Sequence, residues 1–451
     1  MRRFFLEQNK KLKLVMLAGD VIIFFLGLGV VFWLDYRKIS PDWEIQGLLV
    51  IAVILAGFIF LTFYILGLYE PVRVKRPDIL LLSISLALGT LLIFYSSLAY
   101  FFPVLRPGKI ILVVFTLLIG ALTFAWRQVF VRIMRPEPQR ILFIGNNKLI
   151  RELDDFFTSQ LPAFYRSAGQ WHRSSHNPTL PDLEKYVQEN NIDIIVYSVH
   201  SQILQDISPD LINIRFKQKN IFDCHNFYQL VTGKFPIHYM DDFWMLMNSQ
   251  REIFFPGIKD KIKRVFDVCF ALILMPVALP LILLAAAAIR LESKGSALFI
   301  QERLGRNEVP FRLYKLRTMV ENAEQLTGPK WSEEDDPRIT KIGRILRKLR
   351  MDELPQIFNV LKGDMSVIGP RPIRRHFADL LDQELPYYRL RFLVKPGLTG
   401  WAQVNYDYAG SMEGQSQKLQ YELYYLIHQS FLLDLYIVLK TIRVMVWGKG
   451  M

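Results

Sequence analysis

Two adjacent carboxylic acids stand inside a strongly basic part of the sequence. Asp352 and Glu353 are followed by Arg371 and preceded by six cationic residues: Arg338, Lys341, Arg344, Arg347, Lys348 and Arg350. Acids at such a point usually cap a helix, and the cations alone would also fit a solvated face on lipid headgroups. The acids within the basic segment favour phosphate chemistry, in which cations hold phosphates and a carboxylate attacks phosphorus or binds a metal.

A helix is predicted directly after these acids. Leu354, Ile357, Phe358 and Leu361 follow helical spacing and form one apolar face. Because Pro355 is tolerated only in a first turn, we expect the helix to begin near Asp352. Its backbone N–H groups and dipole would then favour anions beside the two acids.

Composition narrows the class of protein. The chain has 451 residues, 51% of them hydrophobic, and a formal charge of +13. Such a charge fits lipid headgroups or phosphorylated substrates, and the apolar segments favour these over nucleic acid. With two cysteines, the sequence excludes a disulfide framework and a cysteine-based zinc site.

Long apolar runs occupy residues 1–136, which we interpret as a four-helix transmembrane bundle. Each run is close to the ~20 residues that a bilayer requires. The runs are Leu14–Leu34, Leu48–Leu68, Ile79–Phe101 and Ile110–Trp126. Lys and Arg gather before the first run, between the second and third (Arg73, Lys75, Arg76), and after the fourth (Arg127, Arg135), which places both ends in the cytoplasm. A transporter is disfavoured, because Asp20 is the only acid inside a run.

Residues 137–258 are predicted to form a small Rossmann-like α/β module in the cytoplasm. Strands are expected at Ile141–Gly145 and Ile192–Val199, with a helical pattern between them. Asn147 stands where a dinucleotide-binding loop has its second glycine, and no third glycine follows. The module is therefore interpreted as degenerate and structural, with nucleotide sensing as the alternative.

The apolar stretch Cys269–Ile289 contains Pro276 and Pro280. Both of its flanks are basic and prefer the cytoplasmic side. Each proline removes a helical hydrogen bond, so a broken helix that enters the leaflet and returns is predicted. The alternative is a kinked fifth span.

Residues 259–451 resemble the bacterial polyprenyl-phosphate hexose-1-phosphate transferases, the monotopic phosphoglycosyl transferases that initiate exopolysaccharide and O-antigen assembly. The resemblance is carried by five ordered motifs: RVFD, QERLGR, YKLRTM, DPRITKIGRILRKLRMDELPQIFNVLKGDMSVIGPRP and PGLTGWAQVN. It implies a mainly helical catalytic domain with a re-entrant helix. It also implies transfer of a sugar 1-phosphate from a UDP-sugar, such as UDP-glucose, to undecaprenyl phosphate at the cytoplasmic face of the bacterial inner membrane.

The resemblance also assigns roles to residues. Asp352 is implied as the nucleophile that forms an aspartyl phospho-sugar, and Glu353 as the ligand of Mg²⁺. Lys315, Arg317 and Arg371 are candidates for binding the phosphates or the nucleotide, and Arg350, from the basic segment before the acids, is a further substrate-binding candidate. Two positions depart from the family: Leu279 replaces the serine before Pro280, and Tyr406 replaces a glycine.

Several points stay open at this level. The alternative function is a non-catalytic membrane scaffold of a polysaccharide assembly complex, which would not need the intact acid pair. The transferred sugar and the oligomeric state, a homodimer included, are undetermined. The segment Ser430–Trp447 is expected either to lie at the membrane interface or to pack on the catalytic core.

Overall fold

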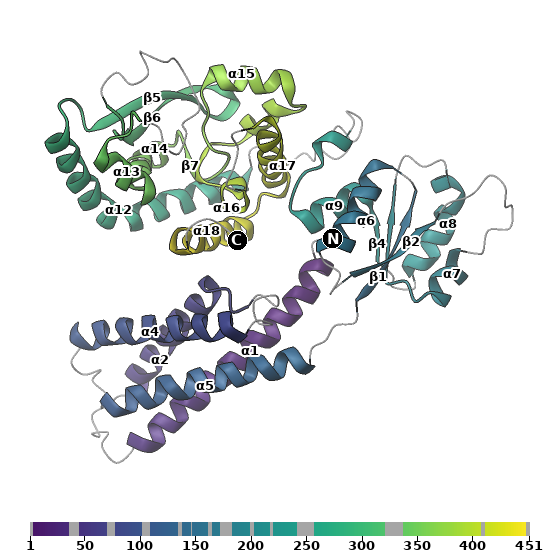
Figure 1. Cartoon of the computed structure of the whole chain (residues 1–451), viewed down its shortest axis with the longest axis horizontal. Coiled ribbons are helices and arrows are strands. Elements are labelled where there is room, and N and C mark those ends of the chain that lie inside the picture. Colours follow the sequence, from purple (N-terminus) through teal and green to yellow (C-terminus); the bar gives the residue numbers. More distant parts are fainter. Residues whose placement is uncertain are drawn as a thin grey trace. The chain divides into compact units, whose positions relative to one another are not determined.

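The computed structural model describes residues 3–35, 45–69, 77–101, 109–133, 138–145, 147–160, 165–171, 183–198, 203–216, 220–240, 257–320, 337–406 and 411–447. The basic residues Arg73, Lys75, Arg76 and Arg135 lie outside these ranges. The chain forms two compact units, Met1–Arg140 with Phe157–Arg166, and Ile141–Phe156 with Ser167–Met451. Figure 1 shows the elements of each.

Helices make up the described part of the first unit up to Ile133. They are α1 (Arg3–Asp35), α2 (Ile45–Ile65), α4 (Pro77–Phe101) and α5 (Lys109–Ile133). Segments of α1, α4 and α5 are long and apolar enough to cross a membrane, and α2 contributes the shorter apolar segment Ala52–Ile65. The four apolar runs are therefore helices, as predicted.

Asp20 and Arg127 form a buried ion pair between α1 and α5, with 2.6 Å between Arg127 Nη2 and Asp20 Oδ2. The sequence suggests Arg127 as a flanking charge beyond the fourth run, but its side chain is fully buried within α5. The two helices approach each other closely here. A Cβ added to Gly19 would lie only 2.2 Å from the Trp126 ring. The acid thus has a partner inside the bundle, which accounts for it without a transport pathway.

A four-stranded sheet with the order β2-β1-β3-β4 follows the helices. Its elements are β1 (Gln139–Ile144), α6 (Lys148–Gln160), β2 (Tyr165–Trp171), α7 (Leu183–Glu189), β3 (Ile194–Tyr197), α8 (Ile203–Phe216), β4 (Asn220–Asp223), α9 (Cys224–Thr232) and the 3₁₀ turn η2 (Ile237–Tyr239). β1 pairs with β3, and β3 with β4, in parallel. The predicted strands are β1 and β3, whose buried apolar runs are typical of parallel sheets.

The remaining elements form the segment that carries the candidate site. They are α12 (Ile258–Glu292), β5 (Leu298–Leu304), η3 (Arg306–Glu308), β6 (Pro310–Leu316), α13 (Lys341–Lys348), η4 (Met351–Glu353), α14 (Gln356–Lys362), β7 (Ser366–Ile368), α15 (Arg375–Glu384), η5 (Tyr388–Leu393), β8 (Gly397–Thr399), α16 (Trp401–Asn405), α17 (Met412–His428) and α18 (Phe431–Trp447). The segment is mainly helical, as expected. It also contains an antiparallel hairpin, β5-β6, and the parallel pair β7-β8.

α12 is one uninterrupted helix that contains both Pro276 and Pro280. The helix is therefore continuous at the prolines, where the sequence predicted a break. A proline removes one helical hydrogen bond, and a continuous helix can accommodate this loss by bending. The ribbon of α12 changes direction along its length in Figure 1. One face of α12 packs small and medium side chains into the core (Ala271, Ala278, Ile282, Ala285, Ile289).

α18 packs on this same core through Leu433 and Ile437. Its other face exposes Phe431, Leu432 and Leu435. Two arrangements were expected for the last apolar segment, and packing on the core is confirmed. The exposed apolar face of the same helix is also compatible with contact with lipid.

Candidate active site

Asp352 and Glu353 lie in the 3₁₀ turn η4, between α13 and α14. Arg350 ends the preceding helical segment in the left-handed conformation, with φ 54°, and so redirects the chain into the turn. The helix α14 begins at Gln356, later than the predicted start near Asp352. Pro355, at the start of α14 with φ −62°, fits a first helical turn, as the sequence suggested.

Two cationic side chains converge on one carboxylate oxygen of Glu353. Lys315 Nζ, from β6, lies 3.0 Å from Oε1, and Arg371 Nη2, from the loop after β7, lies 2.5 Å from it. The Glu353 side chain is 13% exposed. Burial alone would raise the pKa of Glu353, but Arg371 and Lys315 outweigh burial and hold this pKa well below its usual value.

Asp352 is half-buried beside this cluster, and its carboxylate accepts no hydrogen bond from the described residues. Burial raises its pKa, with Lys315 opposing the rise and the Glu353 carboxylate adding to it. The adjacent acids therefore have opposite pKa shifts, as expected where one carboxylate is neutralised and its neighbour is not. A carboxylate left free of hydrogen bonds next to cations is suited to attack phosphorus.

The other two predicted phosphate ligands lie differently. Arg317 donates to the carbonyl oxygens of Ser293 and Lys294, at 3.1 and 2.8 Å, and so holds the C-terminal end of α12. Arg350 has an exposed side chain with no polar contact to another described residue. The structure therefore brings together Asp352, Glu353, Lys315 and Arg371, but not Arg317 and Arg350.

The sequence did not single out Asp267, from the RVFD motif. Its Oδ1 accepts hydrogen bonds from Ser366 Oγ and from the Val367 N–H, both at 2.9 Å. This contact ties α12 to β7, just before the loop that carries Arg371. The sequence did contain one signal for Asp267. This acid lies next to the longest apolar stretch of the segment, where an unpaired carboxylate would be costly.

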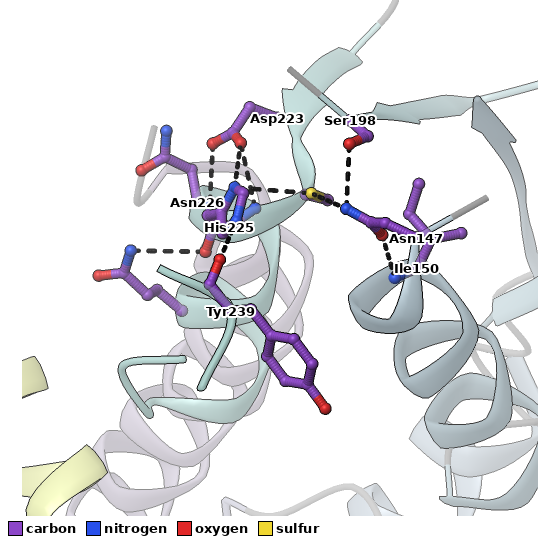
Figure 2. Close-up of polar contacts among 9 residues, drawn as sticks. Asn147, Ile150, Ser198, Asp223, His225, Asn226 and Tyr239 are labelled. Carbon is purple, nitrogen blue, oxygen red and sulfur yellow. Dashed lines mark hydrogen bonds and ion pairs between the residues drawn. The ribbon is translucent and has the colours of Figure 1, made fainter. Parts of the chain in front are cut away.

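A second polar cluster gathers at the carboxyl ends of β1, β3 and β4 (Figure 2). Asn147 Oδ1 accepts from the Ile150 N–H at 2.8 Å and caps α6, while its Nδ2 donates to Ser198 Oγ at 3.0 Å. Asp223 caps α9 by accepting from the N–H groups of His225 and Asn226. At this edge Asn147 thus acts as a helix cap, where a dinucleotide-binding loop would need glycine.

Asp223, Cys224 and His225 bring their potential ligand atoms within 4.8 Å of one another, close enough for a metal ion. However, the potential ligand atoms of His225 and Asp223 already make hydrogen bonds within the protein. His225 Nδ1 lies 3.0 Å from Asp223 Oδ1, and Nε2 lies 3.0 Å from the Tyr239 carbonyl oxygen. Burial would lower the pKa of His225, but the contacts with Asp223 and Cys224 together outweigh burial and raise this pKa to about 10. Because both ring nitrogens of His225 already contact acceptors of the protein, we interpret the cluster as a structural ion pair.

Comparison with known proteins gives a consistent result for the catalytic segment. Residues 258–448 match the family model described as bacterial sugar transferase. UDP-N-acetylgalactosamine-undecaprenyl-phosphate N-acetylgalactosaminephosphotransferase of Aeromonas hydrophila is 47% identical over 189 residues, which cover 42% of this chain and 44% of the relative. UDP-glucose:undecaprenyl-phosphate glucose-1-phosphate transferase of Caulobacter vibrioides is 44% identical over 184 residues, 40% of this chain and 68% of the relative.

A third relative matches more of the chain. Undecaprenyl-phosphate glucose phosphotransferase of Komagataeibacter xylinus is 28% identical over 321 residues, 68% of this chain and 58% of the relative. The similarity therefore extends beyond the catalytic segment.

Proposed function

Because the chain belongs to the bacterial sugar transferase family, we propose that it transfers a sugar 1-phosphate from a UDP-sugar to undecaprenyl phosphate and releases UMP. This reaction would initiate lipid-linked exopolysaccharide or O-antigen synthesis. The observation that carries the proposal is the arrangement around η4, where Lys315 and Arg371 neutralise Glu353 and leave Asp352 free. A non-catalytic scaffold has no need of such an arrangement.

The reaction proceeds in two displacements at the β-phosphorus of the UDP-sugar. An Asp352 carboxylate oxygen forms a bond to this phosphorus, the bond from phosphorus to the bridging oxygen breaks, and UMP leaves with the electron pair. A phosphate oxygen of the lipid then attacks the same phosphorus, and Asp352 leaves as a carboxylate. Covalent catalysis of this kind replaces one difficult transfer by two easier ones.

Lys315 and Arg371 act on charge in both displacements. Both contact Oε1 of Glu353, and both oppose the rise that burial causes in the pKa of Asp352. Cations fixed at this point oppose the repulsion between a carboxylate nucleophile and an anionic diphosphate, and they stabilise charge that develops on the phosphoryl oxygens.

The acid pair is suited to hold Mg²⁺ together with the phosphates of a bound substrate. Magnesium prefers carboxylate and phosphate oxygens and is commonly held by one or two carboxylates together with substrate phosphates. Lys315 and Arg371 already occupy Oε1 of Glu353, which disfavours a third cation until a diphosphate brings its own negative charge. We therefore assign Glu353, with Asp352 beside it, to holding Mg²⁺ together with the UDP-sugar; the ion would neutralise charge on the phosphates.

The contacts of α12 favour the re-entrant path over a fifth span. Near its start, Arg264 Nη1 donates to the Val360 carbonyl oxygen on α14 at 2.6 Å. At its end, Glu292 Oε1 accepts from the Ile342 N–H on α13 at 3.1 Å. A straight helix between those points would be about 40 Å long and would cross the bilayer. Both ends of α12 instead contact neighbouring helices of one compact segment, which can lie on only one side of the membrane.

An exposed apolar surface on α12 supports its insertion. Leu272, Ile273, Val277, Leu283 and Leu284 are all more than half exposed. Such a surface is costly in water and is expected to contact lipid chains. With both flanks of α12 basic, we place the catalytic segment on the cytoplasmic face of the inner membrane.

The α/β part is proposed to be a structural module that docks on the catalytic segment. Trp401 Nε1, on α16, donates to the Gly233 carbonyl oxygen at 2.8 Å, and the Phe235 N–H donates to the Gln420 carbonyl oxygen at 2.9 Å. The side chains of Phe235 and Ile237 are buried in the core formed with α15 and α17.

The direct test is release of UMP by the purified full chain, with undecaprenyl phosphate, Mg²⁺ and a panel of UDP-sugars. We expect UMP from one or a few members of the panel, UDP-glucose and UDP-N-acetylgalactosamine among those tested first. An absence of UMP with every member, from protein that melts cooperatively, would exclude the proposed reaction.

A further inference from the structure

The loop that carries Arg371 is held by its carbonyl groups. Pro370 and Pro372 flank Arg371 and have no N–H to donate. The Pro370 carbonyl accepts from the Gly397 N–H at 2.9 Å, and the Ile373 carbonyl accepts from the Leu304 N–H at 2.9 Å. Between these two contacts, Arg303 Nη1 donates to the Pro372 carbonyl at 3.5 Å, and a shorter hydrogen bond meets the carbonyl of Arg371 itself.

The donor of this shorter hydrogen bond is a buried arginine. Arg391 Nη2, from η5, donates to the Arg371 carbonyl oxygen at 2.8 Å. The same guanidinium makes a two-point contact with Glu422 on α17, from Nε to Oε2 at 2.8 Å and from Nη2 to Oε1 at 2.9 Å. The side chains of Arg391 and Glu422 are 2% and 3% exposed.

The planar guanidinium suits this position. It presents several N–H donors in a fixed fork, so one side chain can serve both oxygens of a carboxylate and a backbone carbonyl. Glu422 supplies the neutralising charge without which a cation could not be buried here. The rings of Tyr388 and Phe392 lie 5.3 and 5.4 Å from the guanidinium carbon and restrict its movement further.

We infer that Arg391, held by Glu422, is a positioning residue for the proposed transfer, which fixes the Arg371 backbone so that the Arg371 side chain reaches Glu353. The inference rests on the proposed function. It assigns Arg391 no contact with substrate, only control of where Arg371 stands. A lysine at position 391 keeps the charge and the ion pair with Glu422, but it cannot reproduce the fork that also holds the carbonyl.

A purely structural ion pair would also be sensitive to mutation, so the test has to separate the two roles. In Arg391→Lys we expect kcat/KM for UMP release to fall roughly ten- to a hundred-fold, as small displacements of catalytic groups do. In an Arg371→Ala background there is no Arg371 side chain to position, so Arg391→Lys should then change the residual rate by less than about two-fold. A general loss of structure would lower the rate by the same factor in both backgrounds.

Arg389→Lys is the matched control. Arg389 lies two positions away on the same turn, and it contacts Glu308, Asp379 and Asp382 near the surface. We expect wild-type release from it. If Arg391→Lys melts far below the wild type, Glu422→Asp replaces it in the same cycle: the shorter acid should draw the guanidinium from the carbonyl, and its effect should again vanish without Arg371.

The outcomes are distinguishable. Wild-type rates in Arg391→Lys, or equal losses with and without Arg371, would overturn the inference while leaving the proposed function in place. Failure of the wild-type chain to release UMP from any UDP-sugar would overturn the proposed function, and the inference with it.

Discussion

Arg371 Nη2 lies 2.5 Å from Glu353 Oε1, and this contact joins two segments that are separated in the sequence, η4 and the loop after β7. The shifts on the two partners agree: the nearby Glu353 raises the pKa of Arg371, and Arg371 opposes burial to lower the pKa of Glu353. Glu353 is thus the fixed centre of charge in the candidate site, and Asp352 is the carboxylate left beside it.

Glu353→Gln should damage both stability and turnover. The amide leaves Lys315 and Arg371 without their shared carboxylate, and we expect a loss of about 1–3 kcal/mol in the free energy of unfolding. UMP release should fall on the order of a hundred-fold or more. If Glu353 holds Mg²⁺, higher concentrations of the ion should recover part of the rate. The measurements are thermal melting and a Mg²⁺ titration of UMP release; a variant that melts and turns over like wild type would remove Glu353 from the site.

The pH dependence of UMP release should report the ionisation of Asp352. Its pKa is raised above the ordinary value of 3.8, and only the carboxylate can attack, so the rate should rise as the pH rises through this pKa. Lys315 favours the carboxylate, so Lys315→Met should raise the pKa further. The acidic limb of the profile should then move to higher pH. A limb that stays in place, or moves to lower pH, would show that Lys315 does not act on the ionisation of Asp352.

Part of the site could be predicted from the sequence, because that part depends on neighbouring residues alone. Asp352 and Glu353 are adjacent, and Pro355 restricts the local backbone, so their position before a helix follows from short-range rules. Lys315 was a candidate only through its motif, and Arg371 through its motif and its place after the acids in the basic segment. Their convergence on one oxygen depends on the hairpin β5-β6 and the pair β7-β8, which are long-range pairings that no local pattern specifies.

Arg317 shows the opposite case. It shares the YKLRTM motif with Lys315, yet it lies just past the end of β6 and donates to the last carbonyl groups beyond α12. Which cation of a motif faces a site depends on where its strand ends. The same limit applies to Arg127, whose partner Asp20 is 107 residues away in the chain.

The path of α12 can be tested with an impermeant thiol reagent on intact cells. In a Cys269→Ser background, Ser296→Cys should stay unlabelled from outside, because Ser296 is exposed just after α12 and the re-entrant path leaves it in the cytoplasm. Gly295 is unsuitable for this change, because its φ of +104° would strain a side chain. Ser40→Cys is the positive control, because Ser40 lies between the first two apolar runs, and cytoplasmic ends of the bundle predict that this loop is external. Labelling of Ser296→Cys in sealed cells would establish a fifth span.

The ion pair at Asp223 and His225 predicts a pH-dependent stability. The pKa of His225 is raised from 6.5 to about 10 in the folded chain by Asp223 and Cys224, against burial. The folded state therefore binds the proton more tightly than the unfolded state. The contribution of the His225 proton to the free energy of unfolding is complete below pH 6.5 and is lost as the pH rises towards 10. The loss is at most about 1.4 kcal/mol per pH unit. In His225→Gln this part of the decline should disappear, whereas the exposed His376→Gln should melt like wild type from pH 7 to 10. Parallel curves for wild type and His225→Gln would refute the raised pKa.

Asp352→Asn separates a nucleophile from a helix cap. Asparagine caps a helix about as well as aspartate, and Asp352 accepts no hydrogen bond from the described residues that an amide would lose. Burial of its charge is unfavourable, as the raised pKa shows, so the variant should melt at or slightly above the wild-type temperature. An amide is a very poor nucleophile towards phosphorus, so UMP release should fall by several orders of magnitude.

The same variant tests the intermediate. Wild-type protein incubated with a reactive UDP-sugar, before lipid is added, should carry a phospho-sugar on the peptide that contains Asp352, visible by mass spectrometry. Asp352→Asn should carry none. Near wild-type UMP release from a folded Asp352→Asn protein would exclude the covalent route. Release that is lost without any adduct on the wild-type peptide would instead favour direct attack by the lipid phosphate, with Asp352 acting as a base or a metal ligand.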